Sequence, residues 1–242
     1  MLRLFSLLLT ALLALPAGAR AAGPLIVNGA GTPLVWTTSP VPFNPDQGTL
    51  GALDNVDALA AVSANFDVWT AVTTATISYI DAGPLPVDVT AANVFDYLGV
   101  CGDGLSPIIF DTDGSIVDDL FGLGASNFIL GFAGPECITF VPPEITEGVA
   151  VLNGKFVDGI DDFDNPEIPL AEFNGVFIHE FGHYANLDHS QIGLLEAFDG
   201  DPANDDAVAT MFPFLINATA ASTLALDDQV SISTLYPEPS FA

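Results

Sequence analysis

Residues 179 to 189 read HEFGHYANLDH and contain all three histidines of the 242-residue chain. His179 and His183 are four positions apart, which places both rings on one side of an α-helix and within reach of one metal ion. A helix cannot also bring His189 to that ion, so the chain must turn back near Asn186, a residue type that tolerates left-handed backbone. The stretch therefore predicts a helix, a turn and a three-histidine metal site.

Glu180 follows the first histidine and suits the role of a general base. Three protein ligands leave a fourth position on a zinc ion open to water, as in catalytic rather than closed structural zinc sites. A carboxylate beside that water can take its proton during attack on a carbonyl group and can return it to a leaving amine. The residues predict hydrolysis of an amide, most naturally a peptide bond. Two alternatives stay open: histidines that bind no metal, and a zinc-binding module without catalysis.

Three helices are predicted from apolar periodicity and capping residues. The histidine helix is expected to begin near Pro169 and to end near Asn186, with phenylalanines 173, 177 and 181 on the face opposite the histidines. A second helix is expected from Asn55 through residue 72, and a third from Asp227 and Asp228 to the residue before Pro237. Each helix needs a packing partner for its apolar side.

Five short strands, rich in β-branched or aromatic residues and bounded by Gly, Pro or Asp, complete the predicted elements. They are expected at residues 34–38, 75–80, 106–110, 126–132 and 147–152. The order of strands and helices predicts an α+β fold with one sheet, in a single domain over residues 22–242.

The composition is strongly acidic, with 3 Lys and Arg against 31 Asp and Glu and a formal net charge of −28 at pH 7. Such a charge repels phosphate backbones and anionic membrane surfaces, so nucleic acids are excluded as partners. Half of the residues are apolar, which is enough to bury a sizeable core. The excess carboxylates either form a solvated surface adapted to salt or bind cations directly.

Residues 1–21 have the pattern of a cleaved secretory signal, with a short basic start, an apolar run and small residues at the end. An uncleaved membrane anchor is the alternative, although the apolar run is short for a span. We therefore expect a secreted protein, extracellular or periplasmic, that does not contact a membrane after cleavage. In that oxidising setting Cys101 and Cys137 are expected to form a disulfide rather than a free reactive thiol.

The chain resembles the metzincin metallopeptidases, and among them the matrixins, whose zinc signature HExxHxxGxxH is followed by a methionine-containing turn. The resemblance rests on HEFGHYANLDHS at 179–190, ATMFP at 209–213 and LALDDQVSISTLYP at 224–237. It implies a monomeric zinc endopeptidase with a twisted five-stranded mixed sheet over two helices, three main helices in all, and a cleft between the sheet and a small C-terminal part. Met211 would lie beneath the zinc ion as an apolar floor.

The family also implies protein or peptide substrates that bind in extended form beside an edge strand, for which GVAVL at 148–152 is the candidate. The chain departs from the matrixin pattern in its long insertion at 191–209, in Asn186 in place of glycine, and in having no histidines for a second, structural zinc ion. An extracellular binding or adhesion module, stabilised by zinc and calcium, is the alternative function.

A calcium site could replace the missing structural zinc. The segment FDTDGSIVDDLFG at 110–122 resembles a truncated calcium loop, in which alternate carboxylates converge and a glycine permits the turn. It lacks the first acidic position of a full EF-hand, and a solvated acidic loop is the alternative. The expected Ca²⁺ ligands are Asp111, Asp113, Asp118 and Asp119.

Overall fold

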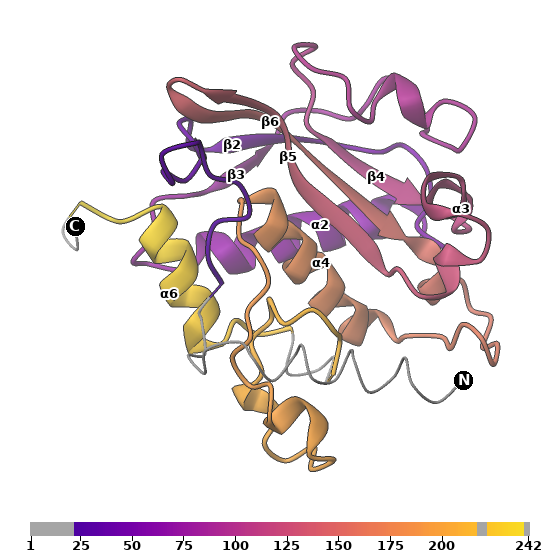
Figure 1. Ribbon diagram of the computed structural model, residues 1–242. Coiled ribbons are helices and arrows are strands. Elements are labelled where there is room, and N and C mark those ends of the chain that lie inside the picture. The colour runs from indigo at the N-terminus through magenta and orange to yellow at the C-terminus, as the bar shows by residue number, and fades with distance from the viewer. Residues whose placement is uncertain (1–21, 217–221, 240–242) are drawn as a thin grey trace, which may run out of the picture.

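The computed structural model describes residues 22–216 and 222–239, so the predicted signal sequence lies outside the described residues (Figure 1). The described chain forms one six-stranded sheet and four α-helices, together with short 3₁₀ turns. The strands are β1 (Val35–Trp36), β2 (Val41–Pro45), β3 (Tyr79–Asp81), β4 (Pro107–Asp111), β5 (Gly131–Phe140) and β6 (Pro143–Asn153). The helices are α2 (Asn55–Thr70), α3 (Ser115–Phe121), α4 (Leu170–Tyr184) and α6 (Leu226–Leu235).

Strand β6 organises the sheet, whose order is β1-β6-β4-β2-β3 with β5 on the other side of β6. β1 and β4 run parallel to the beginning and the end of β6, and β5 runs antiparallel along it. The α+β class is therefore confirmed. The sheet is parallel except for the β5–β6 pair, and it has six strands rather than the expected five. The extra strand is β2, between β3 and β4.

The edge-strand prediction is wrong. Residues 148–152 lie in β6 and pair with β5 on one side, while residues 150–153 of the same strand pair with β4 on the other. Within the described ranges, β5 pairs with β6 alone, so β5 is the edge strand beside the histidine helix. The continuous apolar run GVAVL reflects burial of an interior strand on both faces, which is typical of parallel pairing.

Helices α2 and α4 cover one face of the sheet (Figure 1). The ring of Phe66 on α2 stacks on that of Phe181 on α4, with centroids 3.7 Å apart. The indole nitrogen of Trp69 donates to the carbonyl oxygen of Ile178 at 2.9 Å, so α2 is also hydrogen-bonded to α4. Phe173 and Phe177 are fully buried beside Phe181, which confirms the apolar face expected for the histidine helix.

The opposite face of the sheet carries a second apolar cluster. Side chains alternate along β6, so Ala150 and Leu152 belong to the core under the helices, while Val149 and Val151 belong to this second cluster. The loop between β3 and β4 and the short helix α3 cover it, through Leu85, Val89, Val94 and Ile116 among others. The sheet is thus buried on both sides, which fixes β5 and α4 relative to each other.

Strand β2 was not predicted because its sequence, VPFNP, contains two prolines, which are rare in interior strands. The non-proline residues of the strand make its backbone hydrogen bonds. The amide of Val41 donates to the carbonyl oxygen of Ser78 at 2.7 Å, and the amide of Asn44 donates to that of Ser106 at 2.8 Å. The first half of the strand pairs with β3 and the second half with β4. Pairing with β3 and β4 therefore outweighs the low strand propensity of this proline-containing segment.

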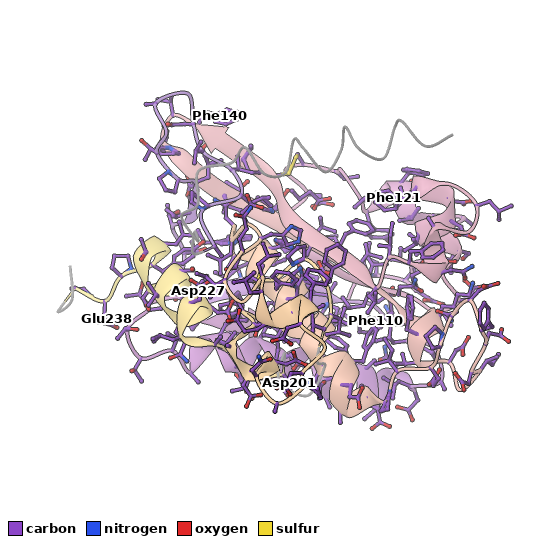
Figure 2. All side chains as sticks on the ribbon, turned by 60° about the horizontal axis from the view of Figure 1, so that its bottom comes forward. Phe110, Phe121, Phe140, Asp201, Asp227 and Glu238 are labelled. Atoms are coloured by element: carbon purple, nitrogen blue, oxygen red, sulfur yellow. A yellow bond between two sulfur atoms is a disulfide. The ribbon has the colours of Figure 1, made fainter. Side chains whose placement is uncertain are left out.

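The Cys101–Cys137 disulfide is present, as expected. It joins β5 to the loop before β4, and its yellow sulfur bond lies beside the β5–β6 hairpin in Figure 2. The end of that hairpin is marked by Phe140, far from Phe121 on α3 (Figure 2). None of the helices in the described ranges is long and apolar enough to cross a membrane.

Candidate metal centre and cleft

The three histidines come together as the sequence predicts. Nε2 of His183 lies 3.0 Å from Nε2 of His179 and 3.2 Å from Nε2 of His189. Helix α4 supplies the first two rings, and the chain beyond its end supplies the third. Tetrahedral zinc with bonds of about 2.0–2.1 Å would place its nitrogen ligands about 3.3 Å apart, so the spacing suits a single ion.

Backbone carbonyl groups fix which ring nitrogen carries the proton. Nδ1 of His179 lies 2.8 Å from the carbonyl oxygen of Thr210, and Nδ1 of His183 lies 2.7 Å from that of Leu187. A carbonyl oxygen only accepts hydrogen bonds, so each Nδ1 is the donor and each neutral ring has its lone pair at Nε2. The outer hydrogen bonds of the first two ligands are therefore satisfied as in zinc sites.

Burial keeps the imidazoles neutral. Desolvation lowers the pKa of His179 to about 3 and that of His183 to about 4, and burial also lowers the pKa of the more exposed His189. Two neutral rings that each present a lone pair at 3.0 Å repel each other unless a cation lies between them. The donor set therefore fits a divalent metal ion, and nitrogen ligands of this kind suit zinc.

Glu180 lies beside the histidines on the cleft side of α4. Its Oε2 atom is buried and has no hydrogen-bond partner among the described residues. Burial raises the pKa of Glu180 to about 8, close to the value that suits a general base or acid at neutral pH. Strand β5 begins against this side chain: a Cβ atom at Gly131 would lie 3.0 Å from Cγ of Glu180. Glycine at that position lets the edge strand approach the carboxylate.

Met211, the residue of the expected methionine turn, lies against the histidine helix α4. Its side chain is fully buried, and a Cβ atom at Gly182 would lie only 2.3 Å from its sulfur. The glycine between the two histidines on α4 therefore makes room for the methionine. Sulfur in this position packs against the helix without needing to bind the ion.

Asp228 on α6 was predicted as a helix-capping residue, and it also holds the methionine turn. Its buried carboxylate accepts the backbone amides of Thr210 at 2.8 Å and Met211 at 3.0 Å, as well as that of Ala225 at 2.9 Å. Since the Thr210 carbonyl orients His179, α6 positions a metal ligand through one intermediate residue. No pattern along the chain indicates this second role.

Asp227 links the same helix to the third histidine. Its carboxylate accepts the hydroxyl of Ser190 at 2.6 Å, and the Ser190 amide donates to the carbonyl oxygen of Met211 at 2.8 Å. Ser190 directly follows His189. In Figure 2, Asp227 lies on α6 (yellow) on the side toward the orange chain that follows α4. Helix α6 thus positions the segments that hold the first and the third histidine, through Asp228 and Asp227 respectively.

Asn186 makes the turn that returns the chain to the metal centre. It is the one non-glycine residue in the described ranges with positive φ, at 74°. Its side-chain oxygen accepts the amide of Ile26 at 2.8 Å, and its side-chain nitrogen donates to the carbonyl oxygens of Ile26 and Leu34 at 3.0 and 2.7 Å. Asparagine replaces the glycine of the matrixin signature and in addition attaches the N-terminal segment to the turn.

Replacing Asn186 by glycine is expected to lower the free energy of unfolding by about 1–3 kcal/mol, because buried groups lose their hydrogen-bond partners. Alanine at the same position loses the same bonds and must adopt positive φ, at a further cost of about 1–2 kcal/mol. Urea unfolding of the two variants separates the contributions, since both lose the same hydrogen bonds and differ in the cost of the backbone conformation in the folded and unfolded states. A glycine variant as stable as the wild type would contradict the role given to the amide.

A cavity of about 470 Å³ opens over the metal centre. It contains all three histidines and Glu180, and it is bounded by the start of β5 on one side and by the chain around the methionine turn on the other. The insertion at 191–209 projects away from the sheet (Figure 1) and contributes Asp205 and Val208 to the wall. Most of the wall is apolar: Leu25, Phe128, Val176, Phe212, Phe214 and Leu215 are among its residues.

The four aspartates of the expected calcium loop do not come together. In the described ranges, groups of three or more possible ligand atoms within 4.8 Å occur at the three histidines and at Cys101, Cys137 and Glu147, whose cysteines are joined in the disulfide. The calcium prediction thus finds no support at these positions.

Backbone amides take the place that a cation was expected to fill. Asp111 accepts the amides of Ile116 at 3.1 Å and Val117 at 2.8 Å, in the first turn of α3, where a carboxylate is favourable. Asp118 accepts the amides of Gly124 and Ser126 at 3.1 and 2.8 Å. These bonds form a 3₁₀ turn where a strand was predicted, and β5 therefore begins at residue 131.

No model of a known protein family matches the chain. No curated protein sequence matches it either. The three-histidine group and the mixed sheet are compatible with the metzincin pattern.

Proposed function

We propose that this protein is a secreted zinc endopeptidase of the metzincin type, similar to the matrixins. One observation carries the proposal: three Nε2 atoms converge in the same cavity as a buried carboxylate that has no partner of its own. Met211 against helix α4 and the turn at Asn186 agree with the family pattern.

His179, His183 and His189 would hold the ion. A zinc ion bound there would supply a Lewis acid, which would lower the pKa of water to about 7 and polarise the substrate carbonyl group. Glu180 accepts the proton of the attacking water and then donates it to the leaving amine. The carbonyl oxygens of Thr210 and Leu187 keep two rings in the tautomer that binds metal throughout the reaction.

The substrates of this proposed enzyme are proteins or peptides in extended conformation. The free edge of β5 runs past Glu180, with Gly131, Phe132 and Ala133 in the cavity wall. An extended peptide can add to such an edge through backbone hydrogen bonds, which places a peptide bond near the metal centre. The edge of β5, rather than residues 148–152, is therefore the proposed place where an extended substrate adds to the sheet.

Metal analysis combined with cleavage of casein and gelatin tests the proposed function. We expect about one zinc ion per chain, as a single three-histidine site requires. Chelation is expected to abolish cleavage, and added zinc is expected to restore it. A purified protein that contains no zinc would contradict the proposal. A protein that retains zinc but cleaves neither substrate nor a peptide library would instead support the binding-module alternative.

A further inference from the structure

We propose that Asp205 selects substrates with arginine or lysine next to the scissile bond. This inference rests on the proposed function, because it names the substrate class of the same cleft. Asp205 lies in the 191–209 insertion, which departs from the matrixin pattern, and it lines the cavity that contains the histidines and Glu180. A residue of the insertion thus reaches the place where a substrate side chain would lie.

The Asp205 carboxylate belongs to a residue that is only 8% exposed. Among residues 22–216 and 222–239 it has no hydrogen-bond or ion-pair partner of its own. Neighbouring Asp206 is exposed and does not line the cavity. Its carboxylate oxygens are not among the buried side-chain atoms that lack a partner, so they are open to the cavity that the residue lines. A cation that enters the cavity can therefore bind Asp205 without displacing a partner within the chain.

The described chain cannot supply that cation. Its only basic side chain apart from the histidines is Lys155, whose Nζ atom donates to Asn127 at 2.6 Å and Ser126 at 3.3 Å. Asp188, at another point of the cavity wall, adds a further negative charge. Apart from the ion that the histidines would hold, the described lining of the cavity has no lysine or arginine to oppose these carboxylates.

The shape of the wall suits a long cationic side chain. Val208 and Phe212 follow Asp205 along the chain, and all three line the same cavity. Arginine and lysine bury their aliphatic stems on apolar surface and place the charge at the tip, where a carboxylate can bind it. A purely apolar substrate side chain would fill the cavity but would leave the Asp205 carboxylate unpaired. The chemistry of the wall therefore favours arginine or lysine over leucine.

The inference is tested with fluorogenic peptides that carry arginine, citrulline or leucine at one position next to the scissile bond. One set varies the residue before the bond, and a second set varies the residue after it. Citrulline has nearly the shape of arginine but no charge, so the comparison isolates the charge. We expect the arginine peptide to be cleaved with a kcat/KM at least about tenfold above that of the citrulline peptide at one of the two positions. D205N is expected to bring the ratio close to one, whereas the matched variant D206N is expected to leave it unchanged.

The controls separate this inference from the proposed function and from general attraction by the acidic surface. Cleavage of the leucine peptide with an arginine to citrulline ratio near one would overturn the inference and leave the peptidase intact. A fall of the ratio in D206N equal to that in D205N would assign the preference to overall charge. No cleavage of any peptide would contradict the proposed function itself. Calorimetric binding of the arginine and citrulline peptides to zinc-loaded E180Q gives a second readout without turnover, in which the same preference is expected.

Discussion

Glu180→Gln is expected to reduce peptide cleavage by at least about 100-fold, and up to about 10,000-fold, while the protein keeps its zinc. Glutamine has nearly the same shape but cannot accept the proton of the attacking water. Glu180 makes no hydrogen bond through Oε2 that the fold would lose, and the histidines would still converge. The measurement is kcat/KM on a fluorogenic peptide together with zinc content and melting temperature.

Glu172→Gln is the matched control for this experiment. Glu172 lies in the first turn of the same helix, α4, and does not line the cavity. Its replacement is expected to leave zinc content and cleavage close to wild type. Unchanged cleavage in Glu180→Gln would refute the role of this residue as the base. Loss of zinc from Glu180→Gln would show instead that the carboxylate contributes to metal binding.

His183→Ala is expected to weaken zinc binding by more than about 100-fold and to abolish cleavage. Even residues that only orient zinc ligands change the affinity by about 10- to 100-fold, so loss of a ligand costs more. His183 is the central ring, since its Nε2 is close to those of both other histidines. Zinc content after dialysis against weak chelator is the direct measurement.

Stability gives an independent readout of the same variant. A ligand present at 1,000 times its Kd stabilises the folded state by about 4 kcal/mol, so zinc should raise the melting temperature of the wild type. His183→Ala is expected to lose this response, whereas Glu180→Gln is expected to retain it. A zinc-dependent melting temperature in His183→Ala equal to that of the wild type would mean that the metal binds elsewhere. The two variants thus separate metal binding from proton transfer.

Helices α2, α4 and α6 were predictable because their signals are local, whereas α3 lies in the segment expected to form a calcium loop. The spacing of Phe173, Phe177 and Phe181 against the two histidines fixes both faces of α4, and the structure ends that helix two residues before Asn186. Strand β2 was not predictable, because its prolines argue against a strand until the pairing with β3 and β4 is known. The identity of the edge strand likewise depends on pairings between segments far apart in the sequence.

The candidate site was predictable where a residue's chemistry is decided by its neighbours along the chain. The three histidines and Glu180 belong to one short run, and the structure brings them together. The roles of the acidic residues were harder to predict, since a carboxylate can bind either a cation or a backbone amide. Asp111 binds the amides of α3, and the cavity position of Asp205 depends on how the whole insertion folds.

The attachment of the methionine turn to Asp228 has a consequence for the order of events during synthesis. Helix α4 ends at Tyr184, whereas α6 ends at Leu235, about fifty residues later in the chain. A nascent chain that still lacks α6 has the first two histidines but not the carboxylate that holds Thr210 in place. The complete histidine arrangement is therefore expected only after α6 itself has been synthesised, so the proposed hydrolytic activity would not precede the synthesis of that helix.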